Sequence, residues 1–316
     1  MIKQKALKKL REFLKNHQRI SIITGAGVSV SSGLPDYRSP LTGSYSKGHK
    51  PTIHKNFMES ELKRKKYFMR SILGWRLFKN AHPNNFHLAV SRLQHEMGNV
   101  QGVVTQNIDR LHQRAGSDNV VDLHGRNDVM KCMNCSTLSP RYRFQQELEA
   151  LNPDIVSKIV FSQSSNLDVG HVREDVEPVR ADGDANLDFL SQDVIRSLVL
   201  PSCPSCSSTI IKPQVVFFGD NVPTKRQELV TSMLSQSDGV LVVGSSLQTF
   251  SIYKFILRWL KNEYSITSPN NHLMVINRHP TRICERHCKE KCEIGHCIQD
   301  VDCEELFVSC LDEVLK

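Results

Sequence analysis

Two pairs of cysteines carry the most specific chemical signal in this sequence. Cys132 and Cys135 form one Cys-x-x-Cys pair, and Cys203 and Cys206 form a second pair further along the chain. Two such pairs supply four thiolates, the ligand set of a tetrahedral zinc site with no position open for a substrate. A redox-active cysteine pair is the alternative interpretation. We expect one structural Zn2+ ion that stabilises a small module.

A glycine turn follows the apolar residues 20–23. Gly25 and Gly27 enclose Ala26, and the next residues can begin a helix whose free N–H groups point back at the turn. A strand, a glycine turn and a helix N-terminus together suit the pyrophosphate of a dinucleotide. The fingerprint is incomplete, because Val30 replaces its third glycine and no acidic residue follows about 20 positions later. An ordinary tight turn between a strand and a helix is the alternative.

Polar residues stand where two further apolar runs end. Gln106, Asn107 and Asp109 follow one run, and His124 follows another. Ligands of parallel α/β sheets bind at the carboxyl ends of the strands, so these side chains are candidates for a binding site. The histidine could act as a general base. The alternatives are a structural histidine and helix capping by Asn107 or Asp109.

Three later segments have the same form. Residues 211–218 end in a glycine turn, residues 239–243 lead into Gly-Ser-Ser at 244–246, and residues 272–276 end at Asn277. Hydroxyl and N–H groups in such a Gly-Ser-Ser turn can bind phosphate or ribose. The repetition of polar residues at strand ends strengthens the interpretation of the first glycine turn as a cofactor site.

The recurrence of strands separated by helices predicts the fold class. We expect an α/β protein with a Rossmann-like, doubly wound parallel sheet and a small inserted zinc-binding module. The large domain should comprise residues 1–125 and 207–316, including a cofactor loop and helical segment at about 39–80. The zinc module should span residues 126–206 and carry a polar, charged insertion.

Composition is that of an ordinary globular protein. The 316 residues are 39% hydrophobic and 23% charged, and no apolar run is long enough to span a membrane. The formal charge is +8, but seven basic residues and only Glu12 of opposite charge lie within residues 1–19. We therefore expect neither specific nucleic-acid binding nor a membrane partner. An amphipathic docking helix is the favoured interpretation of residues 1–19, and a mitochondrial presequence remnant is the alternative.

Ten cysteines without a secretory signal favour thiols or metal over a disulfide framework. Four of them, Cys284, Cys288, Cys292 and Cys297, lie close together near the C-terminus with His287 and His296. A second metal site is one interpretation of this cluster. We favour exposed free thiols.

The ordered motifs resemble those of the sirtuin family. They are TGAGVSVSSGLPDYRS, TQNIDRLHQRAG, VDLHG, the two cysteine pairs, VVFFGD and GSS, and together they span roughly residues 20–305. The sequence is most similar to the mitochondrial sirtuin-4 group. Relatives usually carry a glycine after the asparagine at 277, where this chain has Arg278, His279 and Pro280.

This resemblance implies NAD as co-substrate and a transfer of the acyl group of a modified lysine to ADP-ribose. His124 would be the general base that activates a ribose hydroxyl after the acyl oxygen attacks the anomeric carbon. Asn107 and Asp109 would act with it in catalysis, with Asp109 holding the nicotinamide carboxamide. The implied NAD-binding residues are Gly25, Ala26, Gly27, Asp36, Tyr37, Arg38, Tyr45, Gln106, Asn107, Ile108, Asp109, Gly244, Ser245, Ser246, Asn277, Arg278, His279 and Cys303.

The substrate would be a protein with an acylated lysine. The resemblance implies that its backbone pairs, as an added strand, with Val215, Val216, Phe217, Phe218 and Gly219. Tyr67 and Arg70 match a Tyr-x-x-Arg pattern that accepts carboxyl-bearing or longer acyl groups, because a guanidinium and a phenol can pair with a distal carboxylate. A basic, exposed helix is the alternative.

The function that follows is an NAD-dependent protein-lysine deacylase. An NAD-dependent protein ADP-ribosyltransferase is the alternative within the same site, and a weakly active NAD-binding scaffold is a further one. The resemblance implies a mitochondrial-matrix location, with any presequence short or absent, since only about 19 residues precede the first expected strand.

Overall fold

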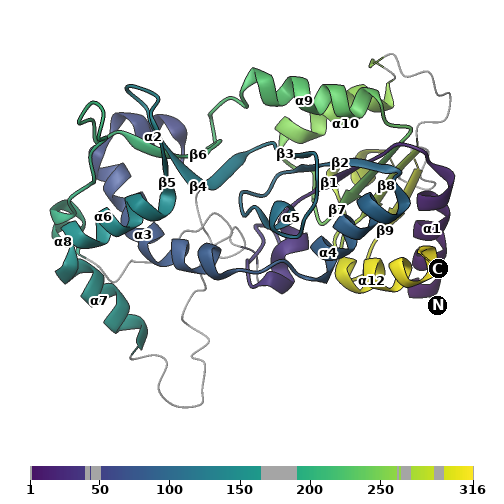
Figure 1. The fold of residues 1–316 in the computed structure, drawn as a ribbon, viewed down its shortest axis with the longest axis horizontal. Coiled ribbons are helices and arrows are strands. Elements are labelled where there is room, and N and C mark those ends of the chain that lie inside the picture. Colours follow the sequence, from purple (N-terminus) through teal and green to yellow (C-terminus); the bar gives the residue numbers. More distant parts are fainter. Residues whose placement is uncertain are drawn as a thin grey trace. The chain divides into compact units, whose positions relative to one another are not determined.

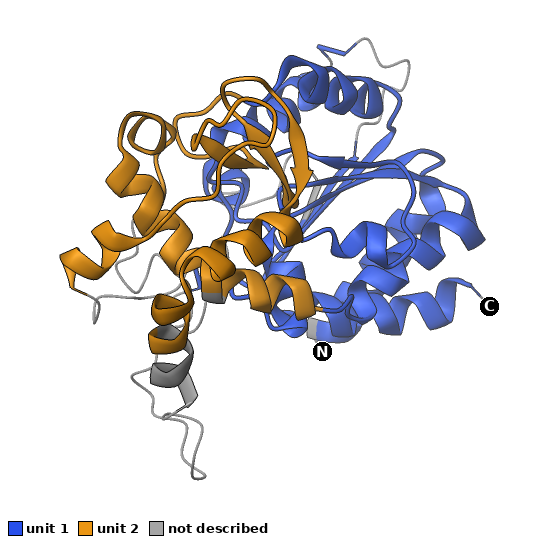
Figure 2. Cartoon of the chain, turned by 60° about the vertical axis from the view of Figure 1, so that its left-hand side comes forward, with its two compact units in different colours: residues 1–39, 82–124, 222–316 blue, residues 40–81, 125–221 orange. Residues whose placement is uncertain are grey.

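The computed structural model describes residues 2–39, 43, 51–164, 191–261, 263–264, 272–287 and 295–315. These residues form two compact units (Figure 2): residues 1–39, 82–124 and 222–316 make unit 1, and residues 40–81 and 125–221 make unit 2. Tyr45, expected to bind NAD, and most of the expected polar insertion lie outside the described residues.

Unit 1 is built on a six-stranded sheet in the order β3-β2-β1-β7-β8-β9, in which every neighbouring pair is parallel (Figure 1). All five residues of β1 and all five of β7 are buried, as expected for central strands of a parallel sheet covered on both faces. The predicted doubly wound sheet is thus confirmed. The strands are β1 (Ile20–Thr24), β2 (Val100–Thr105), β3 (Val120–Asp122), β7 (Gly239–Val243), β8 (His272–Ile276) and β9 (Gly295–Ile298).

Helices of unit 1 pack in two groups. The group of α1 (Ile2–Asn16), α4 (Asn85–Arg92) and α12 (Cys303–Val314) packs together, and Leu10, Leu14 and Phe307 join the sheet residues in one core. The second group is α9 (Thr224–Ser235) and α10 (Phe250–Leu260), and α9 contacts β2 and β3. The expected amphipathic helix at the N-terminus is therefore α1. Shorter helices are η1 (Ala26–Ser32), η2 (Leu93–Met97), α5 (Leu111–Arg114) and α11 (Arg282–His287).

Unit 2 combines a small antiparallel sheet with helices. The sheet has the order β5-β4-β6, from β4 (Gly125–Cys132), β5 (Leu138–Pro140) and β6 (Ile211–Val215). The helices are α2 (His54–Glu59), α3 (Glu61–Asn80), α6 (Arg141–Leu151), α7 (Pro153–Ser164) and α8 (Gln192–Ser197). Phe57, Phe68 and Phe144 lie at the centre of its core.

The division into units differs from the expected boundaries at two places. Residues 40–81 and 207–221 group with the cysteine module, whereas the sequence placed them with the large domain. The physical reason is packing: α3 contacts α7 and α8, and Ser71 on α3 accepts a hydrogen bond from Arg141 on α6. The apolar segment after the second cysteine pair is also shorter as a strand than expected, because β6 ends at Val215.

The C-terminal cysteines correct one expectation. Cys284 on α11 and Cys297 on β9 are joined in a disulfide, so these two residues are not free thiols. The pairing arises because α11 follows β8 and β9 lies beside β8 in the sheet, which brings together two cysteines that a helical spacing would not pair. Cys288 and Cys292 lie outside the described residues.

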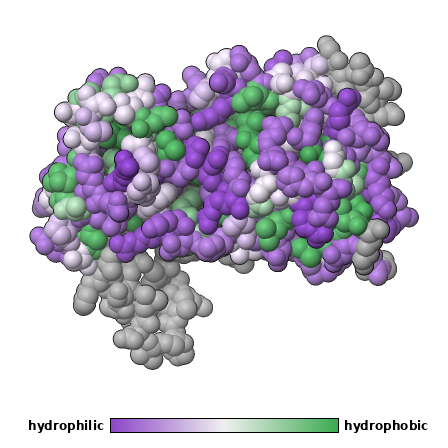
Figure 3. Space-filling model, in the orientation of Figure 1, coloured by the Kyte–Doolittle hydropathy of each residue, from purple (hydrophilic) through white to green (hydrophobic). Residues whose placement is uncertain are grey.

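One face of the molecule, drawn in Figure 3, is largely polar. Hydrophilic residues cover most of the face drawn in Figure 3, and the hydrophobic residues on it form separate small patches. None of the helices in the described part of the chain has both the length and the apolar composition needed to cross a membrane.

Candidate active site and metal centre

The turns after β1 and β7 meet in unit 1. These strands are neighbours in the sheet although they are far apart in the chain, and the strand order reverses between them. The N–H of Gly27 donates to the carbonyl oxygen of Gly244 across 2.9 Å. A Cβ atom added at Gly25 or Gly27 would approach that oxygen to 2.8 or 2.9 Å. The carboxyl ends of strands at such a switch point form the ligand crevice of open α/β sheets.

The close approach of Gly244 explains why residues 25 and 27 are glycines. Gly25 is extended, with φ −133° and ψ −173°, so it is not needed for a left-handed turn. It is needed because the backbone of Gly244 leaves no space for a side chain. The helix that follows is the 3-10 helix η1, shorter and tighter than the helix that the motif suggested.

Asn107 and Asp109 are joined through Ser29, a residue of η1 that the sequence analysis did not single out. Ser29 Oγ donates to Asp109 Oδ2 at 2.7 Å, and Asn107 Nδ2 donates to Ser29 Oγ at 3.1 Å. Asn107 Nδ2 also donates to the carbonyl oxygen of Gly25 at 3.0 Å. Burial raises the pKa of Asp109 above its ordinary value, although the N–H of Leu111 and the Ser29 hydroxyl oppose the shift. The repeated serines after the glycine turn were the signal for Ser29.

His124 lies at the end of β3 and contacts two groups. Its Nδ1 is 3.2 Å from the carbonyl oxygen of Gln106, and its Nε2 is 2.7 Å from Oγ of Ser251 on α10. Burial lowers the pKa of His124 to about 4. The ring is therefore neutral at physiological pH and has a lone pair with which to accept a proton. Ser251 was not expected from the sequence.

Gln106 joins the Gly-Ser-Ser turn to this group. Its side-chain Nε2 donates to Ser245 Oγ at 2.6 Å and to the carbonyl oxygen of Thr24 at 3.2 Å, and its Oε1 accepts from Thr249 Oγ1 at 3.0 Å. Ser246 Oγ accepts from the guanidinium of Arg38 at 3.4 Å. Three of the segments expected to bind NAD, carrying residues 38, 106 and 245–246, thus lie together with the expected base His124.

Other expected cofactor residues also lie in unit 1. Asp36 accepts from the N–H of Ser39 at 3.1 Å, while Tyr37 is half-buried and Ile108 is buried. Asn277 follows β8, and its Nδ2 donates to the carbonyl oxygen of His279 at 2.7 Å.

Arg278 and Cys303 are two further residues that the resemblance implies for NAD binding. Arg278 pairs with Asp302 at 3.3 Å, next to Cys303 at the start of α12, and burial raises the pKa of that thiol to about 12. A thiol with so high a pKa is protonated at neutral pH, so Cys303 can serve as a contact but not as a nucleophile.

Beneath these groups lies a buried layer of hydroxyl and imidazole side chains. Thr24 Oγ1 donates to Thr105 Oγ1 at 2.9 Å, and His112 Nε2 is 3.0 Å from Thr24 Oγ1. Thr105 Oγ1 also accepts from the N–H of Asn107 at 3.1 Å. Burial keeps the pKa of His112 well below its ordinary value, and the ring of His87 lies 4.8 Å away. The layer holds Asn107 through the hydrogen bond from its backbone N–H to Thr105. Nothing in the local sequence around these residues indicated the layer.

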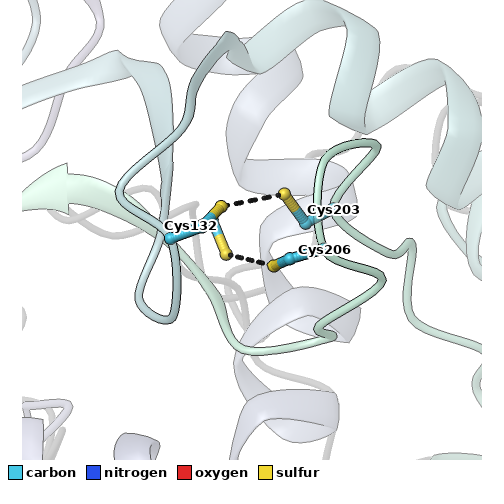
Figure 4. Close-up of side chains that lie close together, drawn as sticks. Cys132, Cys203 and Cys206 are labelled. Atoms are coloured by element: carbon cyan, nitrogen blue, oxygen red, sulfur yellow. Dashed lines mark hydrogen bonds between the residues drawn. The ribbon is translucent and has the colours of Figure 1, made fainter.

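The four cysteines of the two Cys-x-x-Cys pairs lie together in unit 2. Their sulfur atoms are all within 4.8 Å of one another, and the contacts between Cys132 and Cys206 and between Cys135 and Cys203 are 3.6 Å (Figure 4). Four ligands at about 2.3 Å from a tetrahedral zinc ion would be roughly 3.8 Å apart, so this spacing fits Zn2+. Cys132 ends β4, and the two turns that carry the pairs meet at one end of the small sheet.

Tyr67 and Arg70 lie one turn apart on α3. The ring of Tyr67 is buried against aromatic neighbours, with centroids 5.5 Å from Phe57 and 5.3 Å from Phe217. Phe217 belongs to the expected substrate-pairing segment, so this segment and Tyr67 share one aromatic cluster. Phe218, the next residue, is 44% exposed, and its carbonyl oxygen accepts from the N–H of His54. At Tyr67, helix α3 is therefore buried and is not a basic, exposed surface.

The fold and these groups define a class of protein: a Rossmann-like α/β fold with two glycine turns in contact at its switch point and a second unit with four cysteines that could hold a metal ion. A model of the Sir2 family matches residues 25–251. The chain belongs to the Sir2 family, the sirtuins.

Individual relatives agree with this assignment. The chain is 40% identical over 253 residues to the NAD-dependent protein deacylase Sirt4 of Drosophila melanogaster, covering 80% of this chain and 74% of that protein. It is 43% identical over 248 residues to an NAD-dependent protein deacetylase of Xanthomonas campestris, with 78% and 76% covered. A solved structure described as Sir2Tm bound to a propionylated peptide superposes with a TM-score of 0.67 at 23% identity, covering 97% of this chain and 98% of that one, which supports the fold.

Proposed function

We propose that this sirtuin is an NAD-dependent protein-lysine deacylase, which transfers an acyl group from lysine to ADP-ribose and releases nicotinamide. The observation that carries the proposal is His124, a half-buried neutral imidazole whose lone pair lies on Nε2, at the same sheet edge as the Asn107–Ser29–Asp109 group. The names of the relatives support the reaction, since Sirt4 of Drosophila melanogaster is a deacylase and the Xanthomonas protein a deacetylase.

The polar groups at this edge fit NAD. A half-buried carboxylate and a buried amide, here Asp109 and Asn107, complement the donors and acceptor of a carboxamide. The hydroxyls of Ser245 and Ser246 and the guanidinium of Arg38 suit ribose and phosphate oxygens. NAD supplies an anomeric carbon that becomes electrophilic as nicotinamide leaves.

The roles of the protein groups follow from their chemistry. Asp109 orients the carboxamide, because its carboxylate can accept hydrogen bonds from the amide N–H groups. His124 accepts the proton of a ribose hydroxyl at Nε2, because its Nδ1 faces a carbonyl oxygen and must carry the ring proton. The imidazolium that forms is stabilised by the carbonyl oxygen of Gln106.

We further propose that the enzyme prefers acyl groups with a distal carboxylate. Tyr67 and Arg70 on α3 provide a phenol and a guanidinium one helical turn apart, and Tyr67 packs in an aromatic cluster with Phe217 of the expected substrate-pairing segment. The exposed Phe218 forms an isolated parallel bridge to Ile53, so the backbone of this segment can pair as a strand, as the proposed substrate pairing at residues 215–219 requires.

One experiment tests the reaction. The purified protein is incubated with NAD and a panel of acetyl-, glutaryl- and longer acyl-lysine peptides, and the products are identified by mass spectrometry. O-acyl-ADP-ribose and free lysine support deacylation. ADP-ribose attached to protein, with no deacylated peptide, would replace this proposal by the transferase. A His124→Ala variant that retains full turnover would contradict the assigned base.

A mitochondrial-matrix location is proposed on the resemblance to Sirt4 alone. Fractionation of cells that express the natural protein, with matrix markers and protease protection, tests it. Recovery in the cytosolic fraction would contradict it.

A further inference from the structure

His124 is held at both ring nitrogens. A carbonyl oxygen only accepts hydrogen bonds, so Nδ1, 3.2 Å from the carbonyl oxygen of Gln106, must be the protonated nitrogen of the neutral ring. Nε2 then has only a lone pair. Its partner at 2.7 Å, Ser251 Oγ, must donate its hydroxyl proton to it. The hydrogen bond from Ser251 is therefore made to the atom that acts as the base.

Ser251 is carried by a firmly placed helix. It lies in the first turn of α10, which buries Ile252, Tyr253 and Trp259 in unit 1. The residue before the helix, Thr249, donates to the side chain of Gln106, whose backbone carbonyl faces the other nitrogen of His124. A residue at the start of α10 and a residue just after β2 therefore contact the two ring nitrogens of His124.

We propose that Ser251 is a positioning residue for the general base of this enzyme. In the resting enzyme its hydroxyl donates a hydrogen bond to Nε2 of His124. Together with the Gln106 carbonyl oxygen, this hydrogen bond fixes the plane of the imidazole. A neutral imidazole nitrogen has one lone pair, so a ribose hydroxyl that gives its proton to Nε2 takes the place of the Ser251 hydroxyl there. The ring then receives this proton in the plane that Ser251 and Gln106 have set. No group other than the ribose hydroxyl and the imidazole changes its proton count.

The inference rests on the proposed deacylase function. Two partial reactions, nicotinamide exchange and product formation, distinguish a failure of the inference from a failure of the proposed function. Nicotinamide leaves when the acyl oxygen attacks, before the base acts, so exchange of labelled nicotinamide into NAD reports the earlier step. Formation of O-acyl-ADP-ribose requires His124. A residue that acts through His124 should affect the second rate and spare the first. A residue needed only for folding or for NAD binding should lower both.

The experiment compares Ser251→Ala, Ser251→Thr and the wild-type protein in both assays with NAD and an acyl-lysine peptide. We expect Ser251→Ala to lower product formation about tenfold, a part of the 10²–10⁴-fold that a general base typically contributes, and to change exchange less than about twofold. Ser251→Thr keeps the hydroxyl and should restore most of the product formation. Ser309→Ala, which removes a helix hydroxyl that bonds only the carbonyl oxygen of Glu305, is the control for serine removal.

The outcomes are distinct. Equal losses of exchange and product in Ser251→Ala, or no loss in either, would overturn the positioning role. The positioning role would also be overturned if Ser251→Thr exchanged nicotinamide at the wild-type rate but did not restore product formation. A wild-type protein with neither exchange nor product would contradict the deacylase proposal itself.

Discussion

Gly27 and Gly244 lie against each other beyond the carboxyl ends of the two central strands, with the Gly27 N–H donating to the Gly244 carbonyl oxygen across 2.9 Å. This contact joins the turns after β1 and β7, which are parallel neighbours with the strand order reversed between them. Because both turns supply residues expected to bind NAD, their close approach would set the shape of the proposed cofactor site. A side chain added at either glycine would clash with the facing backbone.

Substitution of Gly244 by alanine should damage both stability and NAD binding. Gly244 has φ +61°, and a Cβ there would lie 2.6 Å from the backbone nitrogen of Val28. Gly98 is the matched control, since its φ is +71° but no heavy atom lies within 4 Å of an added Cβ. Gly98→Ala should cost about 1–2 kcal/mol from backbone strain alone, whereas Gly244→Ala should cost roughly 1–3 kcal/mol more from overpacking. Denaturant unfolding measures the two costs; equal values would refute the steric argument.

Replacement of Asp109 by asparagine should stabilise the protein and abolish turnover. Burial raises the pKa of this carboxyl group, so the folded state binds its proton more tightly than the unfolded chain. The charged carboxylate therefore lowers stability once the pH exceeds the unfolded value, and fully so above the folded pKa. A neutral amide lacks that penalty and can still bond to Ser29. Thermal unfolding from about pH 8 down to about pH 4, the ordinary pKa of an aspartate, should show a stability advantage of Asp109→Asn that narrows as the pH falls through the raised folded-state pKa. An advantage independent of pH would contradict the assignment to this carboxyl.

Metal analysis should find one zinc ion per chain. Cys203→Ser removes one of the four sulfur ligands and should release the metal and unfold unit 2, because four-cysteine sites stabilise small modules by binding. Cys310→Ala is the control, since Cys310 is a buried free cysteine on α12 outside the cluster. Inductively coupled plasma mass spectrometry gives the zinc content of each variant. Zinc retained in full by Cys203→Ser would contradict the site, and two ions per chain would indicate a further site.

Loss of Arg70 should change the choice of acyl group. Arg70→Met removes the guanidinium one turn from Tyr67 and should reduce kcat/KM for glutaryl-lysine peptides by about tenfold or more, roughly the value of one charge-assisted hydrogen bond, and spare acetyl-lysine. Arg76→Met is the matched control on the same helix, because Arg76 is half exposed and pairs with Glu149 on the surface. Equal losses on both peptides would count against carboxylate recognition. Tyr67→Phe should show the same selectivity in weaker form.

Several features could be predicted from the sequence because they depend on neighbours in the chain. The cysteine pairs, the buried strands and the amphipathic helix α1 each follow from local spacing and periodicity. The polar residues at strand ends, such as Asn107 and His124, were found for the same reason, since parallel strands bring their carboxyl ends to one edge. The ordered motifs then indicated the sirtuin family, which the comparisons confirmed.

The partners of those residues needed the tertiary structure. Ser29 meets Asp109 across 80 positions of the chain, and Ser251 meets His124 across 127. Cys284 pairs with Cys297 because β9 lies beside β8, and Gly244 crowds Gly27 because β7 lies beside β1. Short-range patterns select the type of each element and the residues that it presents. The order of strands in the sheet, which arises from burying all the elements at once, decides which of those residues touch.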